Sequence, residues 1–104
     1  MKLITKEIER QLLKGGGTPV LKLFCPWGSA TWLISEMNSE DHNMLFGLCD
    51  LGLGFPEIGW VYLSELEEIR GPLGLKIERD LHFKPEMTLE QYADRARVEG
   101  RIVA

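Results

Sequence analysis

The sequence holds few of the residues that most often carry chemistry. Only two cysteines and two histidines occur in 104 residues, and they lack the spacing of a metal site or a redox motif. There is also no Gly-x-Ser-x-Gly turn and no His-Glu-x-x-His pair, so no nucleophile has an evident activating base. We therefore expect a non-enzymatic protein that has no catalytic residue, no metal and no other cofactor.

Long apolar runs and clustered basic residues are absent as well. The opening Met1–Thr5 leads into a polar helix, without the apolar stretch of a signal peptide or a membrane span. We expect a cytoplasmic protein with no membrane partner, in which Cys25 and Cys49 are reduced, packed thiols. The formal charge of −4 makes direct nucleic-acid binding a poor expectation, because neutralising phosphates requires clustered Lys and Arg.

What the chain does have is the composition of one globular domain. Its hydrophobic fraction is 44% and its charged fraction 27%, and no Pro/Ser-rich or charged linker divides residues 1–104. We expect a single α+β domain, in which an antiparallel sheet of four to five strands packs with two to three short helices. A chain of this length favours a shallow site or a flat binding face over a deep cleft.

Three helices are predicted from periodicity and capping. The first begins after Thr5 and ends at the glycines of residues 15–17. The second is short and is predicted to start with a capping box between Ser64 and Glu67. The third starts with a capping box at Thr88. The partner of that cap and the apolar stripe of the third helix are Gln91, Leu89, Tyr92, Ala93 and Ala96.

Alternating hydrophobicity predicts four strands, and the short turns between them predict an antiparallel meander. The predicted strands are Val20–Cys25, Thr31–Met37, Met44–Asp50 and Gly59–Leu63, with a last extended segment between Leu75 and Phe83. Several strands are apolar on both sides, with Trp32 and Ile34 opposite Leu33 and Met37. We expect helices to cover both faces; otherwise part of one face contacts another molecule.

Three polar residues have structural interpretations. His42 lies in a turn-forming segment and is assigned to a hairpin loop. His82 is expected to be exposed or hydrogen-bonded rather than to act as a base. Asp50 ends an apolar strand and is expected to accept a hydrogen bond from its own backbone.

Charges of both signs alternate around the predicted turn at residues 71–75. The simplest interpretation is a set of surface ion pairs that hold the turn. A functional interpretation is that Arg70 and Arg79 form a recognition surface for carboxylates or phosphates, since guanidinium binds either one bidentately. The charged group comprises Glu65, Glu67, Glu68, Arg70, Glu78, Arg79 and Asp80.

The same segment resembles a known family. Residues 70–80 read Arg-Gly-Pro-Leu-Gly-Leu-Lys-Ile-Glu-Arg-Asp, and residues 83–85 read Phe-Lys-Pro. With Leu45–Asp50 and Gly59–Glu67, they resemble a small bacterial family of domains of unknown function carried by plasmids, phages and integrated elements. The resemblance covers most of residues 1–85, whereas Thr88–Ala104 departs from the family's pattern.

The resemblance implies a genetic setting, in which small acidic proteins are commonly inhibitors of host defence. The leading hypothesis is a protein-binding domain that inhibits a defence nuclease or nucleic-acid-binding complex, of anti-CRISPR or antirestriction type. Acidic residues would steer the encounter, and exposed Trp27 or Trp60 would anchor it. The acidic residues are Glu40, Asp41, Glu65, Glu67 and Glu68.

Two other functions stay open. An accessory nucleic-acid-binding protein of plasmid replication or transfer would use Arg70, Arg79 and the stretch Arg95–Arg101. An enzyme would need a deep pocket enclosing His82 or Asp50 beside a second titratable group. The sequence does not predict the oligomeric state.

Overall fold

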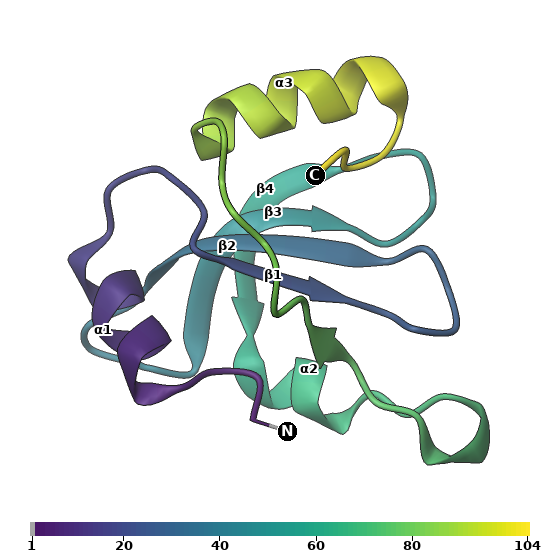
Figure 1. Ribbon diagram of the computed structural model, residues 1–104, viewed down its shortest axis with the longest axis horizontal. Coiled ribbons are helices and arrows are strands. Elements are labelled where there is room, and N and C mark those ends of the chain that lie inside the picture. Colours follow the sequence, from purple (N-terminus) through teal and green to yellow (C-terminus); the bar gives the residue numbers. More distant parts are fainter. Residues whose placement is uncertain (1) are drawn as a thin grey trace.

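The computed structural model describes residues 2–104, and its strands form one sheet with helices on both sides (Figure 1). The strand order is β4-β3-β2-β1-β5, and each neighbouring pair is antiparallel. The predicted α+β domain with an antiparallel sheet is therefore confirmed. The elements are α1 (Lys6–Lys14), β1 (Leu21–Phe24), β2 (Thr31–Met37), β3 (Met44–Asp50), β4 (Glu57–Tyr62), α2 (Leu63–Glu68), the 3-10 helix η1 (Pro72–Gly74), β5 (Glu78–Arg79) and α3 (Leu89–Glu99).

The strand predictions hold best in the middle of the sheet. The bounds of β2 and β3 are those predicted, whereas β4 begins earlier and ends at Tyr62. The predicted last strand shrinks to the two residues of β5, because the Asp80 carboxylate accepts a hydrogen bond from the His82 N–H at 2.8 Å. An aspartate that bonds two residues ahead turns the chain out of the sheet.

Two of the three helix starts are confirmed with their caps. The Thr5 hydroxyl accepts a hydrogen bond from the Ile8 N–H at 3.2 Å. At α3 the Thr88 hydroxyl accepts from the Gln91 N–H, and the Gln91 side chain accepts from the Thr88 N–H. No helix in the part of the chain that the structure describes has the length and apolarity needed to span a bilayer. The predicted α3 stripe is buried: Leu89, Tyr92, Ala93 and Ala96.

The predicted capping box of α2 is wrong. The helix begins at Leu63, its N-cap position is Tyr62, and no side chain of that position caps it. Ser64 lies inside the first turn, where its N–H donates to Asn43 Oδ1 at 2.9 Å and its hydroxyl accepts from Asn43 Nδ2 at 3.0 Å. Asn43, which is distant in sequence, therefore accepts hydrogen bonds from backbone N–H groups at the start of α2. A local serine–glutamate capping box would otherwise bond such groups.

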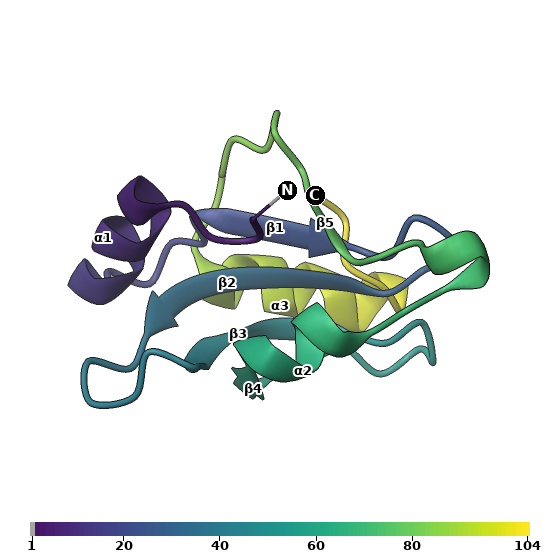
Figure 2. The same ribbon diagram turned by 90° about the horizontal axis from the view of Figure 1, so that it is seen from below.

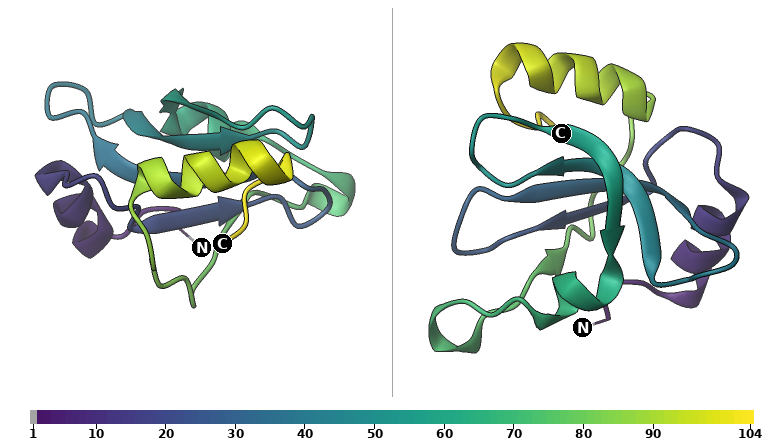
Figure 3. Two further views of the ribbon diagram at one scale, coloured as in Figure 1. Left: turned by 90° about the horizontal axis from the view of Figure 1, so that it is seen from above. Right: turned by 180° about the vertical axis from the view of Figure 1, so that it is seen from behind.

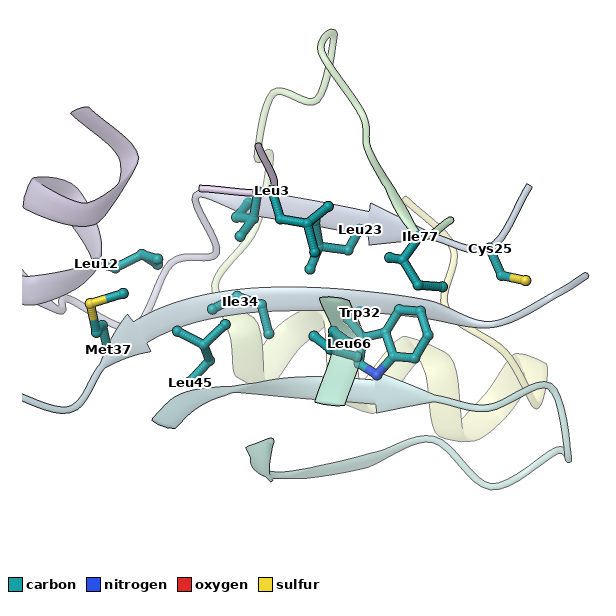
Figure 4. Packing of buried hydrophobic residues seen from close by; sticks show 11 residues of the cluster. Leu3, Leu12, Leu23, Cys25, Trp32, Ile34, Met37, Leu45, Leu66 and Ile77 are labelled. Atoms are coloured by element: carbon teal, nitrogen blue, oxygen red, sulfur yellow. The ribbon is translucent and has the colours of Figure 1, made fainter. Parts of the chain in front are cut away.

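Each face of the sheet carries its own hydrophobic core. The first face lies under α1 and α2, and the second face lies under α3 (Figures 2 and 3). Figure 4 shows the first core, which includes Leu3, Leu12, Leu21, Leu23, Cys25, Trp32, Ile34, Met37, Leu45, Leu66 and Ile77. The second core is built from Leu33, Leu48, Leu89, Tyr92, Ala93, Ala96 and Ile102.

A β-bulge in β2 corrects one predicted orientation. The pairing of β2 with β3 shifts between Ile34 and Glu36, so two residues of β2 oppose one of β3. The shift returns Met37 to the first face with Trp32 and Ile34, whereas strict alternation predicted it on the opposite face. It also moves the Glu36 side chain to the second face, opposite Phe46.

Helix coverage of the second face stops short of β4. Trp60 and Tyr62 retain 46% and 43% of their accessible surface, although both point to the face that carries α3. On this face the expectation of helix coverage is therefore met over β2 and β3, where Leu33 and Leu48 pack with α3, and fails over Trp60 and Tyr62 of β4. This uncovered strip of β4 is where the candidate site lies.

Candidate functional site

The fold brings the two predicted acidic segments together. Asn43, at the end of the turn between β2 and β3, accepts a hydrogen bond from the Leu63 N–H at 2.8 Å through its backbone carbonyl. Its side chain bonds Ser64 as described above. Glu40 and Asp41, in the same turn, therefore lie at the end of the sheet where α2 begins. The α2 carboxylates that join them are Glu65, Glu67 and Glu68, all exposed.

The acidic turn itself is well ordered by its own hydrogen bonds. The Asn38 side-chain oxygen accepts from the backbone N–H groups of Glu40 at 2.8 Å and Asp41 at 3.1 Å. Asp41 Oδ1 in turn accepts from the Asn43 N–H at 3.0 Å. The backbone that carries Glu40 is thus fixed while its carboxylate stays exposed.

Trp60 forms one wall of a groove at this end of the sheet. Its ring packs against Phe46 with centroids 5.1 Å apart and planes inclined at 58°. The groove, called the Trp60 groove below, has a volume of about 510 Å³. It brings together two of the predicted site residues, Trp60 and Glu40. Its other lining residues are Leu13, Lys14, Gly15, Glu36, Met37, Asn38 and Ser39.

Two carboxylates of the Trp60 groove have no basic partner in the described part of the chain. Among residues 2–104, neither Glu36 nor Glu40 lies within 4.0 Å of a basic nitrogen, although Lys14 lines the same groove. Gly15 permits the approach of Glu36: a Cβ on Gly15 would lie 3.1 Å from Glu36 Oε1, and its φ of 69° favours glycine. An exposed indole beside unpaired carboxylates is chemically suited to an ammonium or guanidinium group.

Trp27 does not share this surface. Its side chain is half-buried against the first core, so the expectation of an exposed anchor is not met. A Cβ on Gly71 would lie 2.3 Å from the Trp27 ring, so the indole lies directly on the backbone of the residue 70–75 turn. Trp27 therefore packs this turn against the sheet.

The predicted ion pairs around that turn are wrong. Arg70 donates instead to the backbone carbonyls of Glu67 and Ile69. Arg79 donates to the carbonyls of Lys2 at 2.6 Å and Leu3 at 3.2 Å. Both guanidinium groups thus bond to backbone carbonyls, and neither forms an ion pair with a carboxylate of the turn among residues 2–104.

Comparison with known proteins decides the family. A family model described as protein of unknown function (DUF2958) matches residues 2–103. The chain belongs to the DUF2958 family. The match extends through α3, although Thr88–Ala104 was expected to depart from the family's pattern. No curated protein and no solved structure matches the chain.

In this DUF2958 chain Asp50 has a larger structural role than predicted. Its Oδ1 accepts from the Gly52 N–H at 2.8 Å, which confirms the predicted turn. Its Oδ2 accepts from the Ile102 N–H at 3.0 Å, a contact that the sequence did not indicate. The carboxylate is almost fully buried, at 2% exposure. Asp50 therefore joins the end of β3 to the segment after α3.

The remaining predicted chemical groups stay apart. His42 and His82 are both exposed, as expected for a loop histidine and for a histidine outside the sheet. Cys25 and Cys49 are free thiols. Burial, and secondarily the Glu57 carboxylate, raises the pKa of the Cys49 thiol. Within residues 2–104, no three His, Cys, Asp or Glu side chains converge on a metal site.

Proposed function

We propose that this chain is a non-enzymatic protein-binding domain that acts in the cytoplasm and inhibits a bacterial defence system. Its partner would be a basic nuclease or nucleic-acid-binding complex, as in anti-CRISPR or antirestriction proteins. The observation that carries the proposal is the Trp60 groove, where an exposed indole adjoins Glu36 and Glu40. Tryptophan is enriched among the residues that dominate binding energy at protein interfaces.

The distribution of charge supports the same kind of partner. The net charge is −4, the turn between β2 and β3 supplies Glu40 to the groove, and α2, which bonds Asn43 of that turn, carries further exposed carboxylates. A surface of this sign attracts a positively charged protein and accelerates the encounter at low salt. The nucleic-acid groove of a nuclease is such a surface, because it must neutralise phosphates.

DNA cleavage by purified restriction endonucleases and CRISPR effector complexes tests the proposal directly. The wild-type chain should inhibit at least one of these enzymes, and inhibition should weaken as salt increases. Trp60→Ala should reduce the affinity by roughly thirtyfold or more, the effect of removing a binding hot spot. Phe55→Ala is the matched control, since Phe55 is an exposed aromatic, at 78%, that does not line the groove.

A charge-matched pair of variants tests the role of the carboxylates. Glu36→Gln combined with Glu40→Gln should slow association with the inhibited enzyme and weaken its salt dependence. Glu90→Gln combined with Glu99→Gln changes the net charge equally on α3 and should have little effect. Equal effects of the two double variants, or no inhibition of any defence enzyme, would contradict the proposal.

The nucleic-acid alternative is tested in parallel by fluorescence anisotropy with labelled DNA and RNA. Two of the arginines that the nucleic-acid alternative requires, Arg70 and Arg79, donate to backbone carbonyls. Arg97, in the third basic segment, pairs with Asp94 at 2.7 Å. Asp94 offsets the charge of Arg97, whereas Arg70 and Arg79 keep their charge but are held by the backbone. Binding that declines steeply with salt would favour this alternative over the protein-binding proposal.

A further inference from the structure

The outer side of β4 is an open sheet edge. The strand pairs with β3 on one side, and no other strand among residues 2–104 pairs with its outer side (Figure 2). It is six residues long, Glu57–Tyr62, and its sequence contains no Lys, Arg or Pro. Natural proteins usually blunt such edges with lysine, proline or a covering segment, because an open edge pairs with other chains.

The backbone groups that such an edge presents follow from its register. The Leu63 N–H donates to the Asn43 carbonyl one position beyond the Met44–Tyr62 pair. In antiparallel pairs, hydrogen-bonded and non-hydrogen-bonded positions alternate. The alternation directs the N–H and C=O groups of every second residue away from β3. These residues are Ile58, Trp60 and Tyr62, of which Tyr62 offers its N–H alone, because its C=O accepts the first hydrogen bond of α2.

A glycine in the centre of β4 leaves one face of this strand without a side chain. Gly47 and Gly59 face each other across β3 and β4, but only Gly47 is required by the fold. A Cβ on Gly47 would lie 2.0 Å from the Leu33 carbonyl oxygen, whereas a Cβ on Gly59 would meet no atom of residues 2–104 within 4 Å. The missing side chain leaves room on that face for a side chain of an added strand.

The carboxylates at the two ends of β4 indicate which kind of chain would pair with its open edge. Glu57 stands at one end of β4, and Glu65 follows its other end on α2, near Glu40 and Asp41. In an antiparallel pair of two β4 strands, Glu57 of each copy would approach the Glu65 end of the other. Like charges brought together across strands are unfavourable. A basic segment from a different protein has the complementary sign.

We propose that the β4 edge receives an extended, basic segment of a partner protein as a sixth strand of the sheet. This inference rests on the proposed protein-binding function and specifies how the partner is held. Main-chain hydrogen bonds to Ile58, Trp60 and Tyr62 supply the pairing, and apolar side chains of the added strand pack on Trp60 and Tyr62. Its basic side chains meet the carboxylates at both ends of β4.

Amide hydrogen exchange of the full chain with a synthetic peptide tests strand addition without a defence enzyme. The probe is a short peptide of alternating arginine and valine with blocked ends, measured at low salt. It should slow exchange at the amides of Ile58, Trp60 and Tyr62. An N-methylated copy of the peptide and a glutamate–valine copy should not. No binding of the arginine–valine peptide, binding without this protection, or equal binding of a control peptide would overturn the proposal.

A matched pair of variants isolates the contribution of the strand backbone. Tyr62→Ala and Tyr62→Pro both remove the ring, but only the proline removes the outward N–H, and the native φ of −86° lies close to what proline adopts. The proline variant should bind the peptide about five- to tenfold more weakly than the alanine variant, the effect of one lost hydrogen bond. Equal affinities would overturn strand addition.

The two proposals can fail separately. If Trp60→Ala abolishes inhibition of a defence enzyme while Tyr62→Pro matches Tyr62→Ala, the protein-binding function stands and strand addition is wrong. If no defence enzyme is inhibited but the peptide protects the β4 amides, the proposed inhibitory role is wrong and the edge site stands. Concentration-dependent dimerisation that protects the same amides would overturn the proposal, since the occupant would then be a second copy.

Discussion

The sheet has two edge strands, which differ in length, in charge and in what lies against them. β5 has two residues, and the chain around it is tied down: Arg79 donates to the carbonyls of Lys2 and Leu3. Asp80, the next residue, donates its N–H to the Lys22 carbonyl and pairs with the Lys22 ammonium at 3.6 Å. β4 has six residues, half-exposed aromatics and no such ties on its outer side within residues 2–104.

The difference between the edges is that the chain closes the β5 edge with its own contacts and leaves the β4 edge open within residues 2–104. An unprotected edge with exposed aromatics invites unwanted pairing and aggregation. The β5 side shows that this fold can protect an edge with ordinary side chains. The open edge also lies beside the Trp60 groove and its carboxylates. Four predictions test whether the β5 side is structural and the β4 side is available for binding.

The largest expected effect is the loss of a core side chain near the closed edge. Leu23 pairs with Arg79 of β5 and is fully buried, so Leu23→Ala should lower the free energy of unfolding by about 2–5 kcal/mol. Tyr62→Ala at the open edge should cost less than about 1 kcal/mol. Urea denaturation measures both. Equal losses would mean that β4 is as much a part of the core as β1.

The two facing glycines provide the next test. Gly47→Ala drives a Cβ into the Leu33 carbonyl and should cost about 1–3 kcal/mol of unfolding free energy. Gly59→Ala meets open space and should stabilise the chain by roughly 0.5–1 kcal/mol, because it restricts the unfolded state. Thermal and urea unfolding of the two variants should therefore shift in opposite directions. A destabilised Gly59→Ala variant would show that this position has an internal role.

A smaller effect is expected at the closed edge itself. Arg79→Ala removes the hydrogen bonds to the Lys2 and Leu3 carbonyls and should cost about 1–2 kcal/mol. Hydrogen exchange should then accelerate in the segment before α1. Arg97→Ala is the control, because its exposed pair with Asp94 contributes less than about 0.5 kcal/mol. Unchanged exchange before α1 would show that Arg79 does not hold this segment.

The smallest effect concerns the thiol beside the open edge. Cys49 pairs with Glu57, the first residue of β4, and its pKa is raised by burial and by that carboxylate. A raised pKa leaves less thiolate at neutral pH, so alkylation by iodoacetamide should be slower than for a peptide cysteine and should accelerate as pH rises. Glu57→Gln should speed it roughly twofold at pH 8, measured by mass spectrometry. An unchanged rate would show that Glu57 does not act on the thiol.

The sequence predicts those features of the fold whose determining contacts are local. The caps at Thr5 and Thr88 depend on a partner three residues away, and both are present. The α2 cap failed because its donors are satisfied by Asn43, which is distant in sequence and reaches α2 only through the β3–β4 hairpin. Periodicity likewise gave the bounds of β2 but not the bulge near Ser35, which the alternation of side chains does not reveal.

The candidate site was only half predictable for the same reason. Trp60 and Glu40 were named from residue type, and the fold places both in the groove. Glu36 was missed, since only the bulge turns it toward Trp60. Trp27 is expected to be exposed, but the backbone of Gly71 lies against its indole. Only the tertiary fold brings these two residues together. Contacts of this kind require the folded chain.

Asp50 also has a dynamic consequence. One buried carboxylate binds the N–H of Gly52, in the loop before β4, and the N–H of Ile102, in the segment after α3. When either segment opens, the Asp50 carboxylate loses one of its two hydrogen-bond donors and stays bonded only to the other segment. The loop and the end of α3 should therefore open together as a single cooperative unit, with one shared free energy of opening.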